Sequence, residues 1–188
     1  VTQIISPGAH FDEKLLVSES HNYLASVFRS QKNYGVAFVD LTTGDFSAAY
    51  LQHSDEVLTE LQRMQPSEII VPTEDSKIKP LLADIKAVVS EYDDWVFQLD
   101  TATFTLLEHF KVKSLDGYGL THKESAIGAA GGILHYLVHQ LRRDVRHLTR
   151  IKTYEPTEFV VLDSVTLRHL EILESNHQKT SNSQSLFS

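Results

Sequence analysis

Three β-rich runs follow one another closely near the start of the chain, at 23–28, 34–41 and 46–51. The residues Thr42-Thr43-Gly44-Asp45 between the second and third runs are a hairpin turn signal. Connections this short permit only antiparallel pairing of neighbouring strands, because a parallel crossover needs a dozen or more residues. The fold must therefore contain a three-stranded antiparallel sheet.

After residue 51 the pattern changes to alternating helices and strands. We predict a helix capped by Ser54, a strand at 68–72, a helix at 78–87, a strand at 88–92, and a helix at 101–110 capped by Asp100. Helical crossovers add parallel strands to the antiparallel three. The fold class predicted is α/β, with a ribonuclease H-like mixed five-stranded sheet and flanking helices. Periodicity alone also allows other α/β sandwiches.

A long helix is expected at 123–146, after a capping box at 121–124. Its apolar residues form one stripe, and at 1.5 Å per residue it would be roughly 35 Å long, more than a small sheet domain needs. We expect this helix to leave the sheet domain. A short strand and a helix follow it, and the polar tail from Asn176 is expected to be disordered.

Charge is distributed unevenly along the chain. Residues 1–120 carry nine Lys and Arg against eighteen Asp and Glu, whereas residues 121–188 carry eight against seven. The first part would be repelled by a phosphate backbone, so direct DNA binding there is disfavoured. The chain has no cysteine, which excludes disulfides and thiolate chemistry. With no signal sequence or long apolar run visible, a soluble, cytoplasmic piece of a longer chain is expected.

Segments throughout the chain resemble the MutS family of DNA mismatch-repair proteins, in the family's own order. The run 153–172 is a strand ending in Leu162-Asp163, with Thr166 two residues before Arg168 and then HLEI. The other matching segments are VTQIISPG at 1–8, FVDLTTGDF at 38–46, QPSEII at 65–70, GYG at 117–119 and AAGGILHY at 129–136. Ordered agreement over nearly the whole chain is more specific than any one of these motifs.

The resemblance implies a division of the chain. Residues 1–20 would be the linker and strand leaving a mismatch-binding domain, 21–122 the connector domain, and 123–188 the connecting helix and the beginning of the core domain. The chain has no G-x-x-x-x-G-K-[ST] phosphate loop. We therefore expect no catalysis and no cofactor in this fragment, ATP and Mg²⁺ being implied for the full-length parent. Mismatched DNA and a second MutS protomer would be met only through that parent.

The helix at 101–110 has a candidate partner surface. Ala102, Leu106 and Phe110 lie on its apolar side, whereas Phe104 points to the opposite side. An apolar ring among polar side chains is either incidental or a partner anchor. The resemblance favours the second reading, because the MutS connector meets MutL. The candidate residues on or flanking that side are Thr101, Phe104, Thr105, Glu108 and His109.

A basic cluster follows the long helix, and it consists of Arg142, Arg143, Arg146, Arg150 and Lys152. It could contact DNA, an acidic neighbouring domain or the C-terminal end of the helix. In MutS-like chains this segment is internal to the protomer, so interdomain contacts are favoured.

Two further patterns have simpler interpretations. His135 and His139 have a spacing that can bind zinc, but a solvated polar face shared with Arg142 and Arg146 is favoured. The glycines at 128–132 suggest close packing of the helix rather than a phosphate cradle.

Two alternative functions stay open. The first is a metal-dependent nuclease, for which Asp40, Asp93 and Asp94 are the candidate carboxylates, although Asp40 is also typical of a turn. The second is the connector of a MutS homologue that acts outside repair.

Overall fold

The computed structural model describes residues 22–156. The linker predicted at 1–20, the strand and helix predicted after residue 156, and the tail predicted to be disordered lie outside these described residues.

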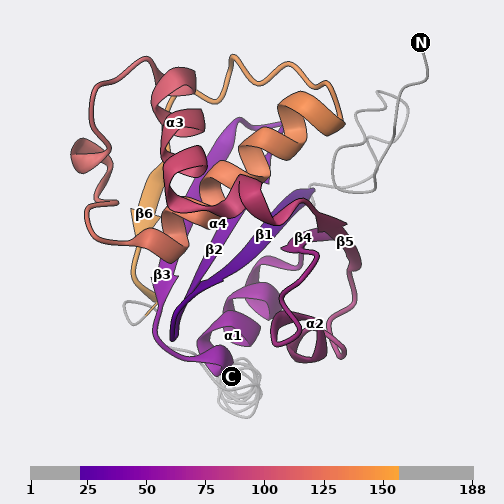
Figure 1. Cartoon of the computed structure of the whole chain (residues 1–188). Helices are drawn as coiled ribbons and strands as arrows, with labels where there is room; N and C mark the ends of the chain where they lie inside the picture. The colour runs from indigo at the N-terminus through magenta and orange to yellow at the C-terminus, as the bar shows by residue number, and fades with distance from the viewer. Residues whose placement is uncertain (1–21, 157–188) are drawn as a thin grey trace, which may run out of the picture. The chain divides into compact units, whose positions relative to one another are not determined.

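One mixed sheet forms the centre of the described part (Figure 1). Its strands are β1 (Tyr23–Ser30), β2 (Asn33–Asp40), β3 (Asp45–Leu51), β4 (Glu68–Pro72), β5 (Val88–Tyr92) and β6 (Lys152–Tyr154), in the spatial order β5-β4-β1-β2-β3-β6. The β1–β2 and β2–β3 pairs are antiparallel, whereas β1–β4, β4–β5 and β3–β6 are parallel. The predicted fold class is confirmed, with six strands in place of five because β6 extends the sheet beside β3.

Helices cover both faces of the sheet (Figure 1). The α1 helix (Ser54–Met64) and the short α2 helix (Ile78–Leu81) lie on one face, and α3 (Leu99–Phe110) and α4 (Glu124–His135) lie on the other. Two 3-10 turns, η3 (Asp94–Phe97) and η4 (Asp116–Tyr118), flank α3, and a π-helical turn, η5 (Tyr136–Gln140), continues α4. None of the helices within residues 22–156 is both long and apolar enough to cross a membrane.

Glycines let the elements on the α3/α4 face approach closely. A Cβ atom at Gly131 would lie 2.4 Å from the Ala102 Cα on α3, and one at Gly35 would lie 2.0 Å from the carbonyl oxygen of Ser125. Gly132 faces the Phe97 ring in the same way. The glycine run of α4 therefore serves close packing, as the sequence predicted, and much of that packing is against α3 and Phe97.

The helix predicted at 123–146 is shorter than expected. The α4 helix begins at Glu124, widens into the π-helical turn and ends before Arg142, which has a left-handed φ of 50°. The Arg143 amide then donates to the Leu137 carbonyl. Leu141, Val145 and Leu148 are nevertheless buried, from a non-helical segment that leads to β6. The spacing of these apolar residues predicts a helix, but the structure shows that they are buried without being helical.

Three predicted helix caps also differ. Ser54 lies inside α1, where the Glu56 carboxylate accepts hydrogen bonds from the amides of residues 52 and 53. Asp100 lies inside the first turn of α3, which begins at Leu99. The Thr121 hydroxyl donates to Asp116, so the expected capping box does not form and α4 starts without a side-chain cap. The helix predicted at 78–87 ends at Leu81.

Candidate functional site

The outward side of α3 carries the predicted partner residues. Ala102 and Leu106 are buried against the rest of the α3/α4 face, and Phe104 is 65% exposed on the other side of the helix. Glu108 is exposed, and the half-buried Thr105 donates its hydroxyl hydrogen bond to the Thr101 carbonyl. We call Thr101, Phe104, Thr105 and Glu108 the α3 outer face.

His109 differs from its predicted companions. Its Nε2 lies 2.7 Å from the Leu148 carbonyl oxygen, and its ring meets Phe110 edge-on at 4.9 Å. The side chain is half-buried and ties α3 to the segment that follows α4. We therefore leave His109 out of the α3 outer face.

Two more exposed apolar residues precede or begin α3, and sequence reasoning missed both. Trp95 is 54% exposed in η3, and Leu99 is 39% exposed at the start of α3. The Trp95 ring meets His135 edge-on with centroids 5.3 Å apart. A lone tryptophan in an acidic, polar stretch was the available sequence signal.

The two histidines at the end of α4 do not form a purely solvated face. Their ring centroids lie 4.1 Å apart, and the Tyr92 hydroxyl lies 2.9 Å from Nδ1 of half-buried His135. Burial, then the neighbouring His139, lowers the pKa of His135, and Asp93 opposes this shift. Within residues 22–156 no group of three or more His, Asp or Glu side chains is placed to hold a metal ion. His135 and His139 therefore have no third zinc ligand beside them among the described residues.

The basic cluster is spread along an irregular segment, and part of its charge is paired. Arg146 forms a close ion pair with Asp144, at 2.6 Å, and Lys152 reaches Asp45 at 2.9 Å. The Arg146 side chain and backbone amide hold the pKa of Asp144 well below its ordinary value. Arg142 and Arg150 are exposed and form no ion pair with other described residues. Fewer of these arginine and lysine side chains are available to a partner than the sequence alone predicts.

The carboxylates proposed for a nuclease lie at opposite ends of the sheet. Asp40 ends β2 beside the start of β1 and accepts hydrogen bonds from the amides of Thr42 and Thr43 at 2.8 and 3.4 Å. Asp93 and Asp94 follow β5, whose parallel neighbours place them near the far end of β1. A two-metal site needs ions ~4 Å apart, and these carboxylates are not brought together.

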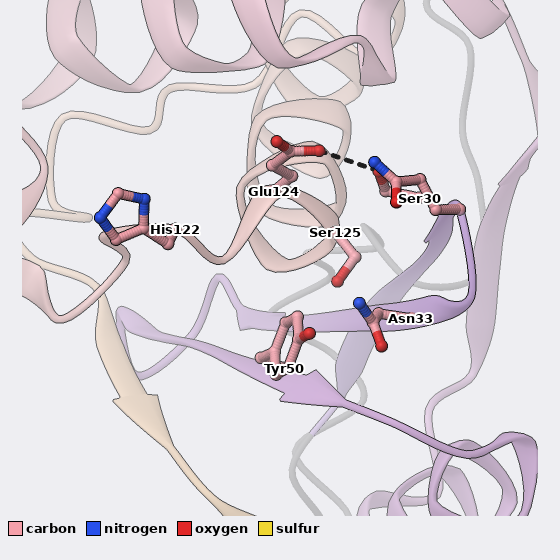
Figure 2. Close-up of a pocket in the computed structure, with 7 residues that line it drawn as sticks. Ser30, Asn33, Tyr50, His122, Glu124 and Ser125 are labelled. Atoms are coloured by element: carbon pink, nitrogen blue, oxygen red, sulfur yellow. Dashed lines mark hydrogen bonds between the residues drawn. The ribbon is translucent and has the colours of Figure 1, made fainter.

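A recessed pocket of about 160 Å³ lies at the N-terminal end of α4, against the β1–β2 hairpin and β3 (Figure 2). Its lining is polar and consists of Ser30, Gln31, Asn33, Tyr50, His122, Glu124 and Ser125. Ser30 donates a hydrogen bond to the Glu124 carboxylate at 3.1 Å. Sequence reasoning did not identify this pocket, although Ser125 is a polar residue at the start of an apolar helix.

Similarity to known proteins covers most of the chain. A family model described as MutS domain II matches residues 22–152. The chain is 40% identical over 179 residues to the DNA mismatch repair protein MutS of Solibacter usitatus, an alignment that covers 93% of this chain and 20% of that protein. The MutS proteins of Lachnoclostridium phytofermentans and Methanococcoides burtonii are 33% and 32% identical over 183 and 181 residues, covering 95% and 93% of this chain and 20% of each relative. The chain thus spans about a fifth of the length of these curated relatives.

Proposed function

Because this chain belongs to the MutS family and contains its domain II, we propose that residues 22–156 are the connector module of a DNA mismatch-repair protein. The module docks MutL through the α3 outer face and passes movement between the neighbouring domains of the full-length protein. It contributes no catalysis. The ATP and Mg²⁺ that the family implies belong to the full-length protein, since this sequence has no phosphate loop to hold them.

Exposure of Phe104 is the observation that carries the docking proposal. Phe104 is 65% exposed on a helix whose opposite side buries Ala102 and Leu106, so its ring is available to a partner without any rearrangement of the fold. Aromatic side chains dominate binding energy where they fill a pocket on the partner. Glu108 and the threonines around Phe104 would form the polar rim that such an anchor requires.

The docking proposal is tested with Phe104→Ala in the full-length protein. We expect MutL affinity to fall about 10- to 100-fold, because truncating a central aromatic anchor costs roughly 1–3 kcal/mol. Surface plasmon resonance with immobilised MutL measures the change. Val88→Ala is the matched control, since Val88 is also an exposed apolar side chain, at 48%, but lies on edge strand β5. Unchanged affinity with Phe104→Ala would refute docking at this face.

A conformational change is proposed to enter the module through residues 152–154, which form β6 and which we call the exit clasp. Lys152 pairs with Asp45, and Tyr154 donates a 2.6 Å hydrogen bond to the Glu60 carboxylate. The hydroxyl of Thr153 donates to the Tyr118 carbonyl at 2.7 Å. These side chains attach the segment that follows α4 to β3, α1 and η4 at once, which supports transfer of a conformational change into the module as a unit.

Tyr154→Phe is expected to loosen the exit clasp and leave the α3 outer face intact. Burial, and then the Glu60 carboxylate, raises the pKa of Tyr154, so the phenol stays protonated and donates. Losing a hydrogen bond to a charged group costs roughly 1.5–3 kcal/mol. We propose that ATP binding elsewhere in the full-length protein changes MutL affinity through this contact. That ATP dependence should weaken in Tyr154→Phe, whereas contact through Phe104 persists. Retention of the full nucleotide dependence in Tyr154→Phe would argue against this route.

The exposed Arg142 and Arg150 support a second, interdomain contact. Both side chains are free of ion pairs with other described residues, and an acidic surface of a neighbouring domain would complement them. Joint replacement by Gln should leave DNA affinity nearly unchanged if the contact is interdomain, and should reduce it with a shallower salt dependence if the segment binds DNA.

A further inference from the structure

The pocket beside α4 holds a buried hydroxyl group without a partner. Ser125 is 1% exposed, and its Oγ forms no hydrogen bond with any described residue. Figure 2 shows this side chain directed between Asn33 and Tyr50. A buried polar group left unsatisfied destabilises a fold by roughly 1–3 kcal/mol, so an atom that enters the pocket and completes this hydroxyl would be favoured.

Other lining groups are equally available. The side chains of Asn33, Tyr50 and His122 form no hydrogen bond within residues 22–156, although all three line the pocket. Each can offer an oxygen or nitrogen atom as an acceptor. The pocket therefore presents several acceptors around a space larger than a single water molecule requires.

Charge decides the class of ligand. The lining has one carboxylate, Glu124, and no lysine or arginine. Glu124 also lies in the first turn of α4, where its negative charge offsets the partial positive charge of the helix N-terminus. An anion would meet this carboxylate without a compensating cation, whereas a cation would be attracted by it.

We propose that this pocket binds the guanidinium group of an arginine side chain from a partner protein segment. The guanidinium donates to the Glu124 carboxylate, to Ser125 Oγ and to the Asn33 side-chain carbonyl, and its plane can lie on the Tyr50 ring. Arginine is preferred over lysine because its planar fork reaches several acceptors, whereas an ammonium is a compact point charge. The site is separate from the proposed α3 outer face and stands or falls independently of MutL docking.

The test uses the full 188-residue chain labelled with ¹⁵N and three acetylated, amidated tripeptides. Gly-Arg-Gly is compared with Gly-Lys-Gly and with Gly-citrulline-Gly, in which citrulline keeps the shape of arginine and removes its charge. We expect saturable shifts at Asn33, Tyr50, Glu124 and Ser125 with the arginine peptide. The lysine and citrulline peptides should bind at least about tenfold more weakly than the arginine peptide, in keeping with the loss of one charge-assisted contact.

Two variants and one control assign the effect to the pocket. Glu124→Gln should weaken arginine-peptide binding about tenfold. Glu155→Gln removes the same charge from an exposed carboxylate outside the lining and should leave binding unchanged. Ser125→Ala should raise the Tm of the chain, because an unsatisfied buried hydroxyl is removed. The same variant should weaken binding of the arginine peptide.

Several results would overturn the proposal. Equal binding of the citrulline and arginine peptides, equal loss in Glu124→Gln and Glu155→Gln, or absence of saturable shifts at the pocket would each do so. Because Glu124 is exposed, its variant keeps the fold even if Ser125→Ala does not.

Discussion

The two faces of the sheet are packed in different ways. On the α1/α2 face, large aliphatic side chains such as Val57, Leu61 and Ile69 fill the space between sheet and helix. The α3/α4 face also holds large aliphatic side chains, but here Gly35 and Gly131 bring backbones together, and Gly128 and Gly132 make room for the rings of Phe28 and Phe97. Glycines thus take part in the packing of the α3/α4 face, whereas side chains fill the α1/α2 face.

Both proposed binding surfaces lie on the same side of the sheet. The α3 outer face and the pocket at the start of α4 both belong to elements of the glycine-lined side. Close backbone contact helps to hold those elements in place, while Phe104 stays exposed and the buried Ser125 hydroxyl has no partner among the described residues.

The largest expected effect is on the side-chain-filled face. Leu61→Ala should lower the free energy of unfolding by about 2–5 kcal/mol, because it leaves a cavity under α1. Urea unfolding of the 188-residue chain measures the loss. At concentrations where the fold persists, binding at the α3 outer face should be unaffected, and a coupled loss would break the comparison between the faces.

On the α3/α4 face, a larger side chain in place of a glycine should be destabilising. Gly131→Ala forces a methyl group against the Ala102 backbone and should cost about 1–3 kcal/mol. Gly117→Ala is the matched control, because a Cβ there meets no atom within 4 Å. Similar unfolding midpoints for the two variants would show that α3 and α4 are not held by glycine contact.

The smallest effect is a pH dependence at the end of α4. Because burial depresses the pKa of His135 below its ordinary 6.5, the unfolded chain takes up a proton at higher pH than the folded chain does. The stability associated with neutral His135 is thus complete above pH 6.5 and declines as the pH falls through the folded pKa. His135→Gln should flatten the Tm profile between pH 7.5 and 5 slightly, and an unchanged profile would contradict this. His147 is exposed, so His147→Gln is the control and should leave the dependence of Tm on pH unchanged.

The strands could be predicted from the sequence because their signals are local. Thr42-Thr43-Gly44-Asp45 marks the hairpin, and the turn holds Gly44 at a φ of 74°. The end of α4 could not be predicted, since Leu141, Val145 and Leu148 repeat at helical spacing while lying in an irregular segment. The left-handed φ of Arg142 depends on tertiary packing and has no composition signal.

The candidate sites divide in the same way. Phe104 could be placed opposite the apolar side of its helix from spacing alone, whereas His109 could not be known to reach Leu148, 39 residues away. The pocket joins a hairpin, β3 and a helix start that are far apart in sequence. Tertiary geometry alone brings Tyr50 and Ser125 together, so no window of sequence contains the site.

The strand order also has a consequence for synthesis on the ribosome. Residues 47–49 of β3 pair with β6, which emerges about a hundred residues later. Until then the outer edge of β3 is an uncovered row of amide and carbonyl groups in a nascent polypeptide, the kind of edge that recruits foreign strands. Translation through Tyr154 closes that edge, and chains truncated earlier should be the more aggregation-prone products.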